Sequence, residues 1–118
     1  KEPETVAYQG KRAVDAAYVR CLQILMQGDG YPMVATHDPA MIDAALLFAR
    51  EKGRSARDFE LQMLYGIRDV EQQRLVRDGY HVRVYLPYGQ QWYGYFMRRL
   101  AERPANLTFF LRSLVSRK

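Results

Sequence analysis

The chain has few cysteines and no long apolar run, and each shortage excludes a class of protein. It holds one cysteine among 118 residues, so it can form no internal disulfide, and we expect a reducing compartment. No apolar run reaches the roughly 20 residues that span a bilayer. Residues 1–4 are charged and turn-like, and we expect no signal peptide there. Cys21 lies at helical spacing among apolar residues, which favours a core position over a nucleophile.

The charge pattern is basic but scattered. The net charge of +5 could serve a nucleic acid, a membrane surface or an anionic cofactor. We find no Lys/Arg run and no helix-turn-helix or RNA-binding signature, so we expect no nucleic-acid partner. A hydrophobic content of 48% excludes disorder, and 13% aromatic residues indicate a true core or a stacking site.

Apolar periodicity alternates between helix and strand along the chain. Strands are predicted at residues 32–36, 59–64 and 81–86, and helices at residues 11–26, 38–53, 69–79, 91–103 and 106–114. Asp38 and Pro39 are a typical start of a helix, and Gly53 stands where a helix ends. Asp69 with Gln72 resembles a capping box for the third helix.

This order predicts an α/β fold with parallel strands, because a helix between two strands returns the chain to the same end of the sheet. Three parallel strands alone leave both sheet edges open and need cover on both faces. We therefore interpret residues 1–118 as the C-terminal portion of a (β/α)8 TIM-type barrel, comprising its last three βα units and a terminal helix, with the N-terminal portion absent from this chain. Polar and aromatic residues gather after the strands, where such barrels carry their chemistry.

A candidate anion site lies on the fourth predicted helix. Tyr95, Arg98 and Arg99 stand at positions i, i+3 and i+4, so they share one helix face. Two guanidinium groups beside a phenol suit a small carboxylate. The alternative is a solvated arginine pair with Glu102 as an intrahelical partner.

Four blocks of sequence together resemble proline dehydrogenase, most closely its bacterial single-function form. They are Ala-Thr-His-Asp at residues 35–38, Phe-Glu-Leu-Gln-Met-Leu-Tyr-Gly at 59–66, Val-Arg-Val-Tyr-Leu-Pro-Tyr-Gly at 82–89, and residues 95–106. Residues 1–4 resemble the segment that follows the family's Lys-Gly-Ala-Tyr motif. The resemblance implies flavin-dependent oxidation of L-proline to Δ1-pyrroline-5-carboxylate, with two electrons passing to FAD and then to a membrane quinone.

The resemblance also implies the substrate-binding residues. Arg98 and Arg99 would bind the proline carboxylate. This agrees with the anion site inferred above from helical spacing, which we call the carboxylate clamp. Tyr95 and Tyr85 would border the substrate ring, and Leu64 would make the family's apolar contact with that ring.

The cofactor residues implied by the resemblance are Thr36 and His37 at the phosphate and ribose of FAD, Glu102 near the cofactor, and Phe109 near the adenine. Asp38 stands where many members have asparagine, and we expect it to cap the following helix. No residue of this chain is assigned as catalytic, and none as a metal ligand.

The same resemblance predicts that this chain is incomplete by itself. Its partner would be the N-terminal half of the barrel, which carries most of the flavin pocket, and without that half we expect no activity. The alternative is a stand-alone basic α/β binding module or an inactive fragment. We expect the enzyme in the cytoplasm, and a peripheral contact with the inner face of the membrane is left open.

Overall fold

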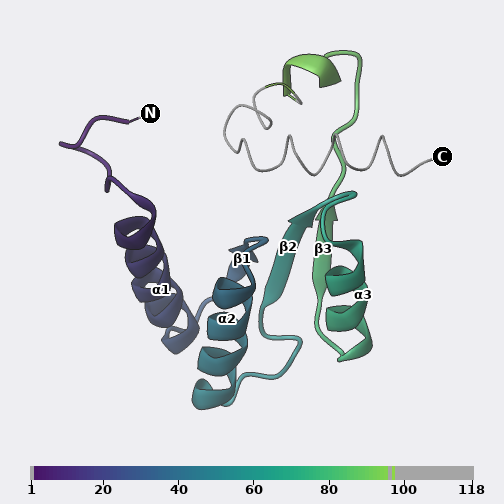
Figure 1. The fold of residues 1–118 in the computed structure, drawn as a ribbon. Coiled ribbons are helices and arrows are strands. Elements are labelled where there is room, and N and C mark those ends of the chain that lie inside the picture. The colour runs from purple at the N-terminus through teal and green to yellow at the C-terminus, as the bar shows by residue number, and fades with distance from the viewer. Residues whose placement is uncertain (1, 96, 98–118) are drawn as a thin grey trace. The chain divides into compact units, whose positions relative to one another are not determined.

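The fold is an α/β arrangement of alternating helices and parallel strands (Figure 1). The computed structural model describes residues 2–95 and 97. The chain divides into two compact units, residues 1–86 and residues 87–118. The first holds α1 (Lys11–Gln27), β1 (Met33–Ala35), α2 (Pro39–Lys52), β2 (Glu60–Leu64), α3 (Asp69–Arg77) and β3 (Val82–Tyr85).

In the second unit, residues 92–95 are helical, in line with the helix predicted from residue 91. The remainder of that helix and the helix predicted at residues 106–114 lie outside the described residues. No helix within residues 2–95 and 97 is long and apolar enough to cross a membrane.

The three strands form one parallel sheet in the order β1-β2-β3. The register pairs Ala35 with Gln62 and Leu64 with Tyr85, so the carboxyl ends of all three strands lie along one border of the sheet. We call this border the carboxyl edge. The parallel pairing predicted from the helix–strand alternation is confirmed.

The ends of α2 are those that the sequence predicts. The carboxylate of Asp38 accepts a hydrogen bond from the backbone N–H of Ala40 at 3.0 Å, and Pro39 occupies the first helical position. Gly53 ends the helix in the left-handed conformation with φ 75°, which glycine adopts without steric cost.

The capping box predicted at the start of α3 is wrong. Arg68 is the N-cap residue, with φ 56° and ψ 46°, and Asp69 is already the first helical residue. The side chain of Gln72 turns back to the preceding loop and donates to the carbonyl oxygens of Leu64 and Ile67. The Gln72 side chain thus bonds to the end of β2 and the following loop instead of capping α3.

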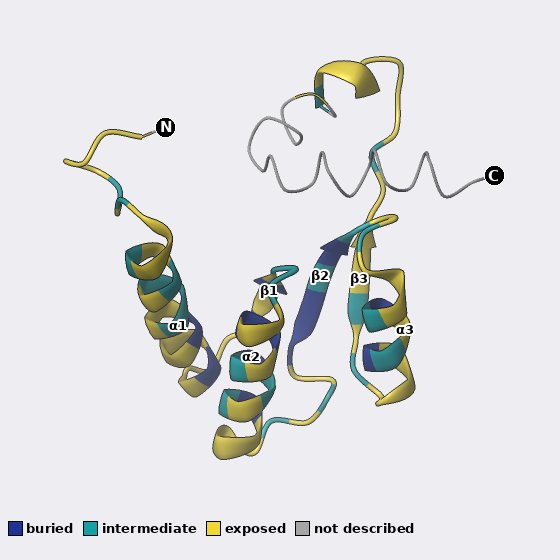
Figure 2. Ribbon diagram, viewed as in Figure 1, coloured by how far each residue is buried: buried dark blue, intermediate teal, exposed yellow. Residues whose placement is uncertain are grey.

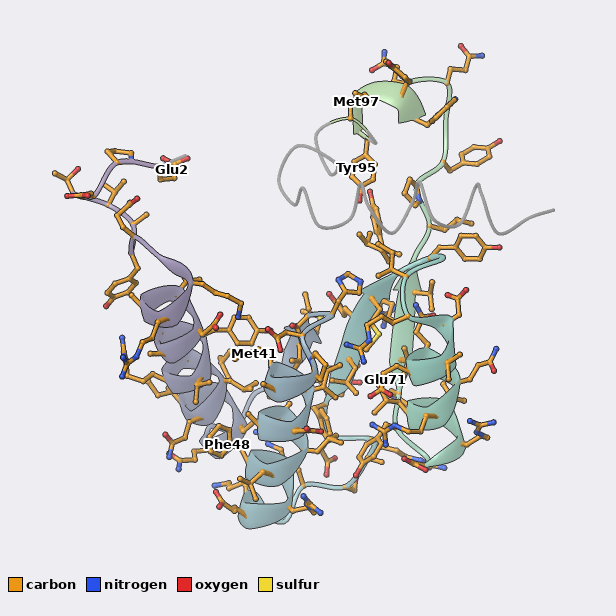
Figure 3. All side chains as sticks on the ribbon, viewed as in Figure 1. Glu2, Met41, Phe48, Glu71, Tyr95 and Met97 are labelled. Carbon is orange, nitrogen blue, oxygen red and sulfur yellow. The ribbon has the colours of Figure 1, made fainter. Side chains whose placement is uncertain are left out.

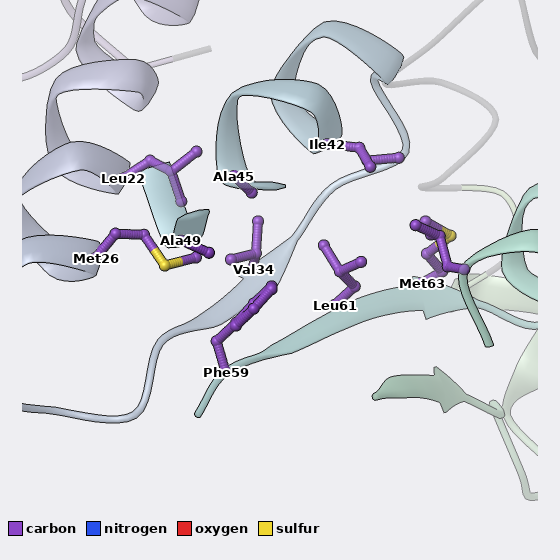
Figure 4. Close-up of a cluster of buried hydrophobic side chains, with 10 residues drawn as sticks. Leu22, Met26, Val34, Ile42, Ala45, Ala49, Phe59, Leu61 and Met63 are labelled. Carbon is purple, nitrogen blue, oxygen red and sulfur yellow. The ribbon is translucent and has the colours of Figure 1, made fainter. Parts of the chain in front are cut away.

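Helices α1, α2 and α3 of the first unit pack on the same face of the sheet. Alternate strand residues point to opposite faces, and Val34, Leu61 and Met63 point toward the helices. Figure 4 shows these side chains packed with residues of α1 and α2. The core consists of the buried residues Leu22, Met26, Val34, Ile42, Ala45, Ala49, Phe59, Leu61, Met63 and Leu75.

The other face carries Met33 and Ala35 of β1, Gln62 and Leu64 of β2, and Tyr85 of β3. Within the described part of the first unit no helix packs on this face, and Met33 and Tyr85 are 62% and 56% exposed. Figure 2 shows the contrast between the mostly buried β2 and the exposed end of β3. We call this surface the open face of the sheet.

Cys21 is exposed, so its predicted core position is wrong. The face of α1 that packs inward is defined by Tyr18, Leu22 and Met26, which stand four residues apart. Cys21 lies off this stripe, as does Leu25, which is 56% exposed. The apolar residues of α1 extend around more of the helix than the single stripe that reaches the core.

Arg54, just after α2, ties the end of α1 to the start of β2. Helix α1 has no basic residue in its last turn, although the last carbonyl groups of a helix need donors. The guanidinium group of Arg54 supplies them. It donates to the carbonyl oxygens of Leu25, Met26, Gly28, Gly30 and Asp58.

We expect Arg54→Met to lower the free energy of unfolding of the intact protein by about 2–3 kcal/mol, because several carbonyl groups lose a charged donor. Urea unfolding measures this change. Arg57→Met is the matched control, since the Arg57 side chain is exposed and makes no contact of this kind among the described residues; its effect should stay within about 0.5 kcal/mol. Equal effects of the two substitutions would contradict the assignment.

Candidate functional site at the carboxyl edge of the sheet

The structure brings four of the nine predicted site residues together. Thr36 and His37 follow β1, Leu64 ends β2 and Tyr85 ends β3, so all four lie at the carboxyl edge. Tyr95 belongs to the second unit, where it extends from the short helical segment near Met97 (Figure 3). The remaining predicted residues, Arg98, Arg99, Glu102 and Phe109, lie outside the described residues.

His37 joins the ends of β1 and β2. Its Nε2 atom accepts a hydrogen bond from the backbone N–H of Leu64 at 2.9 Å. A ring nitrogen that accepts carries no proton, so the neutral imidazole has its proton on Nδ1. The carbonyl oxygen of His37 accepts from the guanidinium group of Arg68 at 3.1 Å. The last residue of β2 therefore holds the ring of His37, and the loop after β2 holds its backbone.

Thr36 and Asp38 organise the turn into α2. The Thr36 hydroxyl oxygen accepts from the backbone N–H of Asp38 at 3.1 Å, and its own proton remains a donor. The carboxylate of Asp38 caps α2 and lies 3.3 Å from the ammonium group of Lys11. The expected capping role of Asp38 is thus confirmed, and part of its negative charge is balanced by Lys11.

This turn presents donors suited to an anionic group. The Thr36 hydroxyl is a donor, and the guanidinium of Arg68, which donates to the carbonyl oxygen of His37, adds positive charge beside this turn. The N-terminus of a helix also favours a nearby anion. These groups suit an anionic or hydroxyl-bearing ligand.

Leu64 and Tyr85 lie side by side on adjacent strands. They are register partners, and their side chains project from the open face. The sheet continues one step further, because the backbone N–H of Tyr65 donates to the carbonyl oxygen of Tyr85 at 3.0 Å. An aliphatic and a phenolic side chain at this position can border a small ring.

An ion pair lies on the open face near the amino-terminal end of β2. Arg83 donates to both carboxylate oxygens of Glu60, at 2.6 and 2.8 Å, and the Gln62 amide donates to Glu60 at 2.7 Å. Glu60 is only 3% exposed, although the Arg83 side chain is largely exposed. The ion pair between Glu60 and Arg83 was missed in the sequence analysis.

Arg83, with a smaller contribution from Gln62, lowers the pKa of Glu60 to about 2 from its ordinary value of 4.5. A carboxyl group whose pKa is depressed on folding stabilises the protein above its unfolded pKa, and this stability is lost as the pH falls toward the folded pKa. The carboxylate form of Glu60 thus contributes fully above about pH 4.5. That contribution disappears as the pH approaches 2.

We therefore expect Arg83→Met to destabilise the intact protein at pH 7 and to lose this effect progressively as the pH falls from 4.5 toward 2. Urea unfolding of both proteins across this pH range gives the difference in unfolding free energy. Arg77→Met, which changes an exposed arginine of α3, is the control and should show no such convergence. If the difference in unfolding free energy between Arg83→Met and the unsubstituted protein did not change with pH, the result would contradict a stabilising ion pair.

Gln72 is a third residue of this region that the sequence analysis missed. It is 9% exposed, and its amide donates to the carbonyl oxygens of Leu64 at 3.0 Å and Ile67 at 2.8 Å. The available signal was a polar residue at an inward position of an amphipathic helix. The capping-box interpretation assigned this residue to the helix end instead.

Comparisons with known proteins identify the family. The model of the proline dehydrogenase family matches residues 2–112. The chain is 47% identical to proline dehydrogenase 2 of Bacillus subtilis strain 168 and 42% identical to proline dehydrogenase 1 of that strain, over 99% of its own length in both cases. It is 46% identical to the proline dehydrogenase of Deinococcus radiodurans over 97% of its length.

The chain therefore belongs to the proline dehydrogenase family, as the sequence motifs predict. It spans 39% of the length of the two Bacillus relatives and 37% of the Deinococcus one.

Proposed function

We propose that the intact protein is a flavin-dependent dehydrogenase that oxidises L-proline to Δ1-pyrroline-5-carboxylate. The observation that carries this proposal is the family match over nearly the whole chain, together with the gathering of Thr36, His37, Leu64 and Tyr85 at one edge of the sheet. In this proposal, residues 1–118 supply the carboxylate clamp and part of the FAD site.

We further propose that β1, β2 and β3 are the last three strands of a (β/α)8 barrel. Helices cover one face of the sheet, as on the outside of such a barrel, and the open face carries a satisfied ion pair that suits its packed interior. The proposed partner of residues 1–118 is the N-terminal half of the same barrel, which would cover the open face.

The proposed substrate-binding residues are those that the family resemblance implies. Arg98 and Arg99 would bind the proline carboxylate through charge-assisted hydrogen bonds. Leu64, Tyr85 and Tyr95 would surround the ring. The support is the strand-end position of Leu64 and Tyr85 and the helical spacing of Tyr95 with the two arginines.

The proposed cofactor is FAD, which supplies the hydride acceptor when it is bound. Thr36 and His37 would hold its phosphate and ribose portion, in keeping with the donors described above. Glu102 and Phe109 are proposed as further contacts. A membrane quinone would then take the electrons, which places the proposed enzyme in the cytoplasm with access to the inner face of the membrane.

The direct test is to add L-proline without oxygen to the purified intact protein. The proposal predicts a bound flavin whose visible absorption is bleached by L-proline and restored by a quinone. A flavin that proline does not bleach, or an intact protein that binds no flavin, would refute it.

We expect Arg98→Ala and Arg99→Ala in the intact enzyme to raise the KM for proline by about ten- to a hundredfold, because each removes a charged hydrogen bond worth roughly 1.5–3 kcal/mol. Steady-state kinetics with a quinone acceptor measure the change. Arg12→Ala, at an exposed position of α1, is the control. Unchanged proline kinetics in both clamp variants would remove the carboxylate assignment.

A further inference from the structure

The backbone of Leu64 is held from both sides by side chains of other elements. Its N–H donates to Nε2 of His37 at 2.9 Å, and its carbonyl oxygen accepts from the amide of Gln72 at 3.0 Å. The loop adds one further bond, from the N–H of Ile67 to the same carbonyl oxygen at 3.3 Å. Leu64 is the last residue of β2 and lies beyond Gln62, the last residue of β2 that pairs with β1.

The burial of Gln72 and its two amide protons suit this contact. It is almost fully buried in the first turn of α3, and its amide donates to the carbonyl oxygens of both Leu64 and Ile67. An amide nitrogen has two protons, so one group can serve both acceptors. Buried carbonyl groups that lose their donor cost free energy, and no apolar side chain can replace it. A carboxylate would place negative charge against two carbonyl oxygens.

The loop after β2 is also hydrogen-bonded to the loop after β1. Arg68 adopts φ 56°, an uncommon conformation for a residue with a side chain, and its guanidinium donates to the carbonyl oxygen of His37. The connections after β1 and β2 are thus joined by two hydrogen bonds, both through His37. A shift of Leu64 would disturb a residue assigned to the cofactor as well as one assigned to the substrate.

We propose that Gln72 is a positioning residue for substrate: by holding the carbonyl group of Leu64, it fixes the apolar wall against which the substrate ring packs. This inference rests on the proposed function and adds a residue of α3 that touches neither substrate nor cofactor. Gln72 acts on ring recognition through Leu64, and the carboxylate contacts do not depend on it.

The consequence is a specific kinetic pattern. A wall that moves by a fraction of an ångström binds the five-membered ring of proline less well and accepts a larger ring more readily. Loss of the Gln72 amide should therefore raise the KM for proline about threefold or more while leaving kcat within about twofold. L-pipecolate, with the same carboxylate on a six-membered ring, should gain affinity relative to proline.

The experiment compares Gln72→Met and Gln73→Met in the intact flavin-loaded enzyme. Methionine has a length similar to glutamine but no donor, and the exposed Gln73 is the adjacent residue on the same helix. The proline KM, kcat, flavin content and the inhibition constant of L-pipecolate are measured for each. In Gln72→Met we expect the KM for proline to rise and the flavin content to stay normal. The inhibition constant of L-pipecolate divided by the KM for proline should fall in this variant. Gln73→Met should show neither change.

Two kinetic results would overturn the inference. One is an unchanged proline KM and ring-size ratio in folded Gln72→Met. The other is a parallel loss of flavin content and kcat without a change in that ratio, which assigns Gln72 to folding alone. If Gln72→Met does not fold, Gln72→Asn is judged by the same criteria, and failure of both to fold also assigns Gln72 to folding. Proline oxidation by the unsubstituted enzyme tests the proposed function separately.

Discussion

The structure depends on the parallel pairing of β1, β2 and β3. Parallel strands linked by helices place every carboxyl end at one edge, and they place the helices on one face. The register then makes Leu64 and Tyr85 neighbours and brings His37 within hydrogen-bonding distance of the Leu64 backbone. The ion pair between Glu60 and Arg83 depends on the same register, because the two residues lie on adjacent strands and point to the same face.

Features set by local chemistry could be predicted from the sequence. Asp38 as the cap of α2 and Gly53 at its end require only the preferences of single residues for helix ends. The end of β2 at Leu64 follows from the spacing of apolar residues, whereas the same spacing predicts the end of β3 at residue 86, one residue beyond its observed end at Tyr85. The family resemblance added roles for these positions, and the family itself is confirmed by comparison.

Features set by contacts between distant segments could not be predicted in this way. Gln72 was placed in a capping box because the local spacing allows one, but its amide is used by the end of β2. Arg54 reaches a carbonyl group 28 residues away, and Arg83 reaches a carboxylate 23 residues away. Such pairs require the register and the packing of helices on strands. Cys21 shows the same limit, because periodicity on α1 does not decide which stripe reaches the core.

The central proposal is that the carboxyl edge forms one wall of a closed substrate site, and that the rest of a barrel supplies the remainder of this site. A crystal structure of the intact protein with a proline analogue that cannot be oxidised tests it most directly. The account predicts that the open face of the sheet lines a closed barrel, with the analogue's ring against Leu64 and Tyr85 and its carboxylate at Arg98 and Arg99. An open sheet, or an analogue bound away from Leu64, would contradict the account.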